Sequence, residues 1–239
     1  MSVLIQYGWI FMSALMIYGI VAPTHANQES PPYDLSSQSM EKPLVILGAS
    51  YAAGLEAADL AGFPVINKGV GGEQSFEMLA RFDADVVRHN PQIVLIWGFI
   101  NDIFRSDPSR IEQTLEKTKT SFIEMVSLAQ RHGIQPVLAT EVTMSLKPGF
   151  KEAALSFVGR LLGRTGYQDY VNNHVMTVNR WLLNYASENN LVIFDIQTEL
   201  AGKDLMRKKI YAQDDGSHIS EEGYRVITTF LEEGLASLN

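Results

Sequence analysis

The sequence has no cysteine among its 239 residues, which excludes disulfide bonds, a thiolate nucleophile and cysteine-ligated zinc. Basic residues are also few. The chain carries 19 lysines and arginines against 27 aspartates and glutamates, and its formal net charge is −8. Without a basic stripe that could neutralise phosphates, a general role in binding nucleic acid is disfavoured.

Charged side chains are absent from residues 1–26, and the run from Val3 to Ala22 is almost wholly apolar. The run is followed by Thr24-His25-Ala26, a small-residue cleavage pattern. We therefore predict a signal peptide over 1–26 and a periplasmic or secreted protein. Because the run is nearly long enough to span a bilayer and lacks a basic start, an uncleaved membrane anchor is the alternative. Residues 27–42 are rich in Ser, Pro and Gln and are expected to form a flexible segment.

From Pro43 onward, apolar runs alternate with segments of helical periodicity. Five runs are predicted to be strands: Leu44–Leu47, Pro64–Asn67, Gln92–Trp97, Ile134–Ala139 and Leu191–Phe194. Continuous apolar strands separated by helices are typical of parallel sheets covered on both faces. We predict an α/β fold, a three-layer α/β/α sandwich with a five-stranded, mainly parallel sheet. It forms one domain over 43–239, with an insertion around 142–173 where Pro and Gly interrupt the alternation.

Helix ends are marked by capping residues. Asp107-Pro108 predicts a cap with proline at the first helical position, and Ser220 is expected to cap the last helix. The helix after Pro108 is predicted to pack on the sheet through a stripe at spacings of three and four, namely Ile111, Leu115, Thr118, Phe122, Met125 and Ala129.

A candidate nucleophile follows the first strand. Gly48-Ala49-Ser50 is a strand-to-helix turn, and the helix that follows would point free N–H groups at the serine. Taken alone, Ser50 is more simply a helix cap. A serine hydroxyl becomes a good nucleophile only when an oriented base takes its proton.

A candidate base lies near the other end of the chain. Asp215 precedes His218 by three residues, so in a compact turn its carboxylate can accept from the ring Nδ1–H and leave Nε2 as the base. The simpler alternative is an acidic turn with a surface histidine. A metal site using Asp214, Asp215 and His218 is disfavoured because no second histidine has ligand spacing.

Two further loops could supply hydrogen-bond donors. Three glycines lie between Gly69 and Gly72, after the second strand, which suits a structural turn, an anion-binding loop or an N–H donor to an oxyanion. The dinucleotide fingerprint lacks its third glycine here. Asn101 follows the strongest strand and can place an amide above the sheet, unless it only caps a turn.

Together these segments resemble the SGNH hydrolase superfamily, also called the GDSL esterases and lipases, from about Leu44 to the C-terminus. Its first block, Gly-Asp-Ser, matches Gly48-Ala49-Ser50, and its fifth, Asp-x-x-His, matches Asp215 and His218. The Asp-Asp-Gly-Ser-His run is similar to that of bacterial lysophospholipase/thioesterase members. The resemblance implies a flavodoxin-like fold and a catalytic triad of these three residues.

The second and third blocks of that family carry the oxyanion hole. Asn-x-Gly-x-x-Gly matches Asn67, Gly69 and Gly72, and the asparagine of Gly-x-Asn-Asp matches Asn101. The resemblance thus implies an oxyanion hole formed by Ser50, Gly72 and Asn101. Two positions depart from the pattern: the usual aspartate of the first block is Ala49, and the glycine of the third block lies further upstream, at Gly98.

The resemblance implies a serine ester hydrolase that acts on acyl esters, thioesters, lysolipids or O-acetylated sugars, without a cofactor or metal. Two alternatives stay open. An acyltransferase would use the same site, and a binding protein on a decayed hydrolase scaffold would fit Ala49 and the altered third block. The sequence names neither the acyl chain nor the alcohol.

Overall fold

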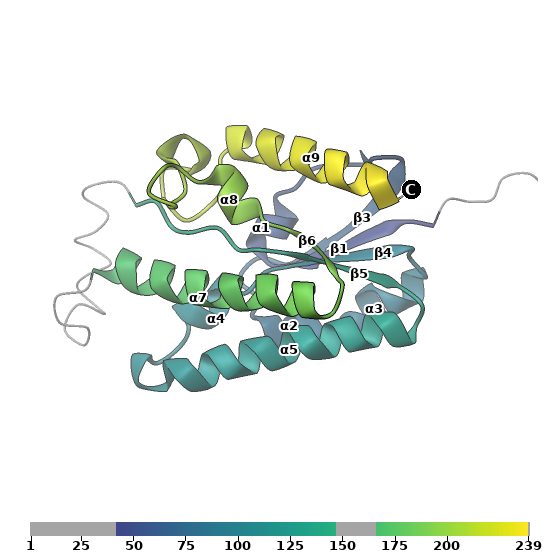
Figure 1. Cartoon of the computed structure of the whole chain (residues 1–239), viewed down its shortest axis with the longest axis horizontal. Coiled ribbons are helices and arrows are strands. Elements are labelled where there is room, and N and C mark those ends of the chain that lie inside the picture. Colours follow the sequence, from purple (N-terminus) through teal and green to yellow (C-terminus); the bar gives the residue numbers. More distant parts are fainter. Residues whose placement is uncertain (1–41, 147–165, 239) are drawn as a thin grey trace, which may run out of the picture. The chain divides into compact units, whose positions relative to one another are not determined.

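A computed structural model describes residues 42–146 and 166–238, which belong to one compact unit spanning Met40–Asn239 (Figure 1). Its six-stranded sheet has the order β2-β3-β1-β4-β5-β6. All neighbouring strands are parallel except β2 and β3. The strands are β1 (Leu44–Gly48), β2 (Asp59–Leu60), β3 (Phe63–Gly69), β4 (Ile93–Trp97), β5 (Gln135–Ala139) and β6 (Val192–Phe194).

The mainly parallel sheet and all five predicted strands are confirmed. The sixth strand, β2, has only two residues and pairs antiparallel with β3 at the sheet edge. Every residue of β1 and β4 is buried, which explains why these central strands are continuous apolar runs.

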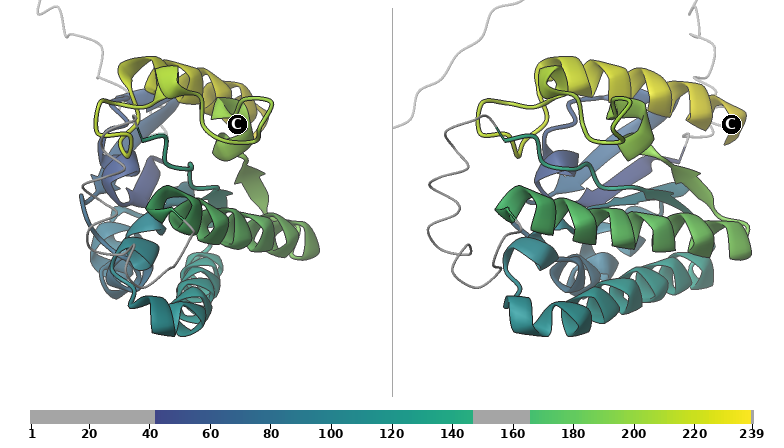
Figure 2. Two further views of the ribbon diagram at one scale, coloured as in Figure 1. Left: turned by 90° about the vertical axis from the view of Figure 1, so that its left-hand side faces the viewer. Right: turned by 60° about the vertical axis from the view of Figure 1, so that its left-hand side comes forward.

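Helices cover both faces of the sheet (Figures 1 and 2). One layer contains α1 (Ser50–Ala53), α8 (Ile196–Leu200) and α9 (Glu221–Leu235). The other contains α2 (Ser75–Ala80), α3 (Phe82–Asp85), α4 (Ile100–Phe104), α5 (Ile111–Arg131) and α7 (Tyr167–Glu188). Short 3₁₀ turns are η1 (Val87–His89), η2 (Pro108–Arg110), η3 (Lys209–Tyr211) and η4 (Ala236–Leu238).

The predicted helix caps and core stripe are confirmed. Asp107 accepts from the N–H of Ser109, and Ser220 accepts from that of Gly223. In the predicted stripe of α5, every position from Leu115 to Ala129 is buried, and Ile111 packs against the core at its edge.

The predicted signal peptide (1–26) and nearly all of the predicted flexible segment (27–42) lie outside the described residues. So does most of the predicted insertion, because 147–165 are not described; residues 142–146 form a buried segment that is neither helix nor strand, and α7 begins at Tyr167. Within the described residues, no helix is both long and apolar enough to cross a membrane.

Candidate active site

Ser50 opens α1 directly after β1 ends at Gly48. A Cβ on Gly48 would lie 2.1 Å from the carbonyl oxygen of Trp97, so only glycine fits where β1 passes β4. The next residue, Ala49, is 1% exposed and donates its N–H to the same Trp97 oxygen at 3.3 Å. The turn therefore presents Ser50, which is partly exposed, at the carboxyl end of the sheet.

The short helix α1 is held by β3. The side-chain amide of Asn67 donates to the carbonyl oxygens of Ala52 (2.8 Å) and Leu55 (2.9 Å). A Cβ on Gly69 would lie 2.1 Å from the backbone nitrogen of Ala53, so glycine is required there too. Asn67 and Gly69 thus position the helix that begins with Ser50.

Asp215 and His218 form a closed hydrogen-bonded turn. The Oδ2 of Asp215 lies 2.5 Å from Nδ1 of His218, and its Oδ1 accepts the N–H groups of Ser217 and His218 at 2.9 Å each. Burial acts to raise the pKa of the Asp215 carboxyl, but these hydrogen bonds outweigh it and lower that pKa. The carboxylate stays ionised and fixes the ring, as the sequence predicts for this pair.

Tyr51 connects the turn that carries Ser50 to the turn that carries His218. Its hydroxyl donates to the carbonyl oxygen of Ser217 at 2.8 Å, and its ring lies edge-on to that of His218 with centroids 6.5 Å apart. Tyr224 in α9 donates to the carbonyl oxygen of Tyr51 at 3.0 Å. The residue after Ser50 therefore contacts both His218 and the residue before it. Among the described residues, no hydrogen bond joins the Ser50 hydroxyl to the His218 ring itself; such bonds are often long in free sites.

The candidate oxyanion donors lie on the neighbouring loops. Asn101, in the first turn of α4, donates one amide hydrogen to the carbonyl oxygen of Glu73 at 3.0 Å, which ties it to the loop of Gly72. Gly72 has a φ of +83°, a left-handed conformation that favours glycine. Within the described part of the chain, the N–H groups of Ser50 and Gly72 donate to no acceptor.

The family model of the GDSL-like Lipase/Acylhydrolase family matches residues 46–226. The chain belongs to this family. The match runs from β1 into α9 and so includes every candidate site residue. Membership confirms the resemblance drawn from the sequence and places the chain among the ester hydrolases.

Solved structures share the fold at low sequence identity. A GDSL-like lipase from Bacteroides thetaiotaomicron VPI-5482 is 18% identical with a TM-score of 0.63, covering 83% of this chain and 89% of that one. A catalytic mutant of Axe2, an acetylxylan esterase from Geobacillus stearothermophilus, is 17% identical with a TM-score of 0.59, covering 79% and 91%. The uncharacterized lipoprotein YqeF of Bacillus subtilis (strain 168) is 23% identical over 86 residues, which are 36% of this chain. The match spans about a third, 35%, of that relative's length.

In this GDSL-family chain, a buried arginine holds the histidine turn. Arg207 is 3% exposed, and its guanidinium donates to three successive carbonyl oxygens, those of Gly216 (2.8 Å), Ser217 (2.9 Å) and His218 (3.2 Å). Arg207 was not predicted as a site residue, because it lies in a lysine-rich run that is typical of a solvated loop.

A buried glutamate, also missed from the sequence, supports the third block. Glu141 is 0% exposed, and its Oε1 accepts the N–H groups of Phe99 (3.4 Å) and Ile100 (3.2 Å), just before Asn101. Its Oε2 has no partner among the described residues. Desolvation by burial raises the pKa of Glu141 to about 7. The nearby Asp102 instead ties α2 to α5, through Ser75 and Thr118.

Glu141 should make stability depend on pH. Its pKa is about 7 when folded and 4.5 in the reference state, so the folded protein holds the proton longer. The free energy of unfolding should therefore fall as pH rises from 4.5 to 7, by up to about 3 kcal/mol. Glu141→Gln should flatten this slope in urea unfolding measured at several pH values. Glu112→Gln, at an exposed glutamate of α5, is the control; equal slopes in the two variants would contradict the assignment.

Metal ligands do not gather in the described residues: no group of three or more His, Asp or Glu side chains is arranged to hold an ion. The site offers the hydroxyl of Ser50, the oriented imidazole of His218 and the free N–H groups of Ser50 and Gly72 near the carboxyl end of the sheet. These are the parts that acyl transfer to serine requires.

Proposed function

We propose that this protein is an exported serine ester hydrolase that works through Ser50, His218 and Asp215 and forms an acyl-enzyme. The observation that carries the proposal is the contact of Tyr51 with Ser217 and His218, because it brings the serine turn to the imidazole turn. Membership of the GDSL-like lipase/acylhydrolase family supports the class of reaction.

In the proposed first step, Nε2 of His218 takes the proton of the Ser50 hydroxyl while Oγ of Ser50 attacks the carbonyl carbon of the ester. The tetrahedral intermediate collapses, the bond to the alcohol breaks, and His218 gives its proton to the leaving oxygen. Water, activated by the same imidazole, then hydrolyses the acyl-enzyme. Asp215 keeps the imidazole in the correct tautomer and stabilises its charged form.

The oxyanion would be held by the N–H groups of Ser50 and Gly72 and the side-chain amide of Asn101. An amide nitrogen carries two hydrogens, and Asn101 uses one of them on Glu73, so the second is available to the substrate. Missing such a donor costs about 2.7–4 kcal/mol of transition-state stabilisation.

Asn101→Ala should therefore lower kcat by about 10²–10³-fold with a smaller change in KM. Steady-state kinetics on a soluble ester measure both, and a thermal unfolding curve checks that the tie to Glu73 is not needed for folding. Asn173→Ala, at an exposed position of α7, is the matched control. A kcat within threefold of the wild type for Asn101→Ala would remove Asn101 from the proposed hole.

The relatives bear on the substrate and on the location of this protein. An acetylxylan esterase shares the fold, which favours small acyl groups on a sugar among the candidate ester substrates. A lipoprotein among the relatives, together with the apolar residues 1–26, favours export.

The test is a panel of p-nitrophenyl esters of increasing acyl length, run on protein that starts near Asn27, with Ser50→Ala as the blank. We expect turnover of at least one ester above the blank, and the rates across the panel then give the acyl preference directly. Turnover equal to the blank for every ester would favour the binding-protein alternative.

A further inference from the structure

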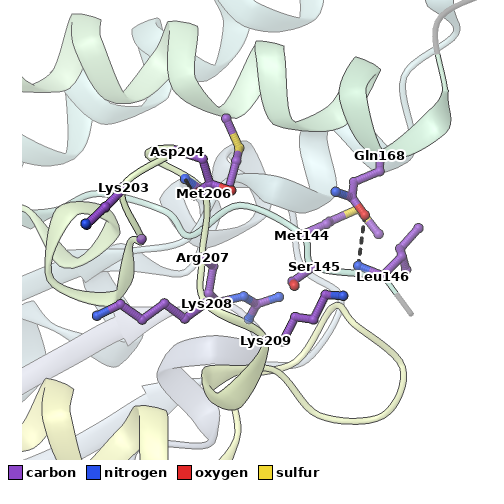
Figure 3. Close-up of a pocket in the computed structure, with 11 residues that line it drawn as sticks. Met144, Ser145, Leu146, Gln168, Lys203, Asp204, Met206, Arg207, Lys208 and Lys209 are labelled. Carbon is purple, nitrogen blue, oxygen red and sulfur yellow. Dashed lines mark hydrogen bonds between the residues drawn. The ribbon is translucent and has the colours of Figure 1, made fainter. Parts of the chain in front are cut away.

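A pocket of about 640 Å³ is lined in part by Arg207, the arginine that holds the histidine turn (Figure 3). Its walls come from residues 144–146, which follow β5, from Gln168 in α7, and from residues within 202–209, which run from the end of α8 into η3. Strands β1, β4 and β5 are parallel, so their carboxyl ends lie at the same end of the sheet. Ser50 follows β1 and residues 144–146 follow β5, so the pocket opens at the end of the sheet where Ser50 lies.

The pocket shares a wall with the histidine turn. The N–H of Ser145 donates to the carbonyl oxygen of Gly216 at 2.8 Å, and Arg207 holds the next two carbonyls. A Cβ on Gly216 would lie 2.6 Å from Cα of Leu146, so the turn and the pocket wall are in direct contact. A group bound in the pocket would therefore sit next to the turn that carries the proposed base.

Positive charge is concentrated in this pocket although the whole chain has a net charge of −8. Lys203, Arg207, Lys208 and Lys209 line it, and the acidic residue of the same run, Asp204, accepts the N–H of Met206. Across the described ranges 42–146 and 166–238, no carboxylate forms an ion pair with any of these three lysines.

Arg207 adds to the positive charge of the pocket from a buried position in its wall. It is buried, donates to carbonyl oxygens and, within the described structure, pairs with no carboxylate within 4 Å. A buried charge acts at a lower effective dielectric than an exposed one, so it attracts an anion more strongly. The exposed lysines can make the direct contacts, since an ammonium group binds phosphate or carboxylate as a point charge.

We propose that this pocket binds an anionic group, a phosphate or a carboxylate, on the alcohol part of the ester substrate. The inference rests on the proposed function, in which His218 gives its proton to the leaving alcohol. The alcohol therefore departs on the His218 side, which is the side of the pocket. The substrate is then an acylated alcohol with an acidic group, such as a glycerol phosphate or a uronic acid.

The experiment compares matched esters that differ in charge. One pair is 1-butyrylglycerol 3-phosphate and 1-butyrylglycerol; the other is acetylated methyl glucuronide and acetylated methyl glucoside. We expect kcat/KM to be about tenfold or more higher for the charged member of at least one pair at low salt, with the preference shrinking as salt is added. The preferred pair identifies the source of the anion as phosphate or carboxylate.

The variant Lys208→Gln/Lys209→Gln should lose the preference and keep its rate on the neutral esters. The control Lys119→Gln/Arg131→Gln changes the net charge equally on α5, away from the pocket, and should keep the preference. Hydrolysis of neutral esters without a preference for either anion would overturn the inference and leave the proposed function standing.

A binding measurement without turnover distinguishes failure of the anion-site inference from failure of the proposed hydrolase function. Calorimetric titration of the wild-type protein with glycerol 3-phosphate and with methyl glucuronide should show binding of at least one, weakened in Lys208→Gln/Lys209→Gln. If neither binds, or if the variant binds equally well, the pocket is not an anion site, whatever the outcome of the ester assays.

Discussion

Ser50→Ala should reduce ester hydrolysis by at least about 10⁴-fold, because no acyl-enzyme can form without the hydroxyl. Alanine removes one oxygen from a partly exposed side chain, so the free energy of unfolding should change by less than about 1 kcal/mol. His218→Ala should cause a loss of similar size, and the double variant should lose no more than either single variant. This non-additivity is expected when two groups act as a unit.

Ser217→Ala is the matched control. Ser217 lies in the same turn as His218, and it is the carbonyl oxygen of its backbone that Tyr51 and Arg207 hold. Its removal should leave kcat within a few-fold of wild type. If Ser217→Ala instead abolished turnover and Ser50→Ala did not, the proposed nucleophile would be wrong.

Arg207→Lys should be strongly destabilising although it keeps the positive charge. Lysine keeps the charge but cannot present the planar fork that reaches three carbonyl oxygens, so at least one of them loses its hydrogen bond to this side chain. Hydrogen bonds to charged groups contribute about 1.5–3 kcal/mol each, and we expect a loss of about 2–4 kcal/mol in the free energy of unfolding. Urea unfolding measures it.

We expect Arg207 also to position His218, and this effect can be measured separately from stability. At a temperature where Arg207→Lys is fully folded, kcat on a neutral ester should still fall by about 10–100-fold with little change in KM, because the imidazole is displaced and a neutral ester has no anionic group for the pocket to hold. Arg225→Lys, at an exposed arginine of α9, should change neither quantity much. A fully active folded Arg207→Lys would show that the arginine is structural alone.

The layers of the fold were predictable because the central strands are buried on both sides. Such strands leave uninterrupted apolar runs, as in β1 and β4, which are visible in the sequence without any partner. The edge strand β2 could not be predicted, because two residues carry no periodicity and their pairing depends on the adjacent β3.

The same contrast holds at the site. Ser50, Asp215 and His218 could be named because their chemistry is carried by residue type and order along the chain. Arg207 and Glu141 act through burial, and burial of a charged side chain cannot be read from its neighbours in sequence. Arg207 becomes meaningful only when three carbonyls converge on it, and Glu141 only when two N–H groups do.

The departure at Ala49 also becomes clear from the packing. A Cβ on Gly98 would come within 3.0 Å of the Ala49 Cβ, so this part of the turn is tightly packed against the end of β4. An alanine fits there with 1% exposure and leaves Ser50 at the start of α1. The missing family aspartate therefore does not prevent the turn that presents the serine.

The central claim is tested most directly by reacting the folded protein with a fluorophosphonate probe and mapping the adduct by mass spectrometry. We predict one adduct, on the Ser50 hydroxyl. It should form much more slowly in His218→Ala and should be blocked by an excess of an ester that the protein hydrolyses. A folded wild-type protein that stays unlabelled at Ser50, or is labelled at another residue, would contradict it.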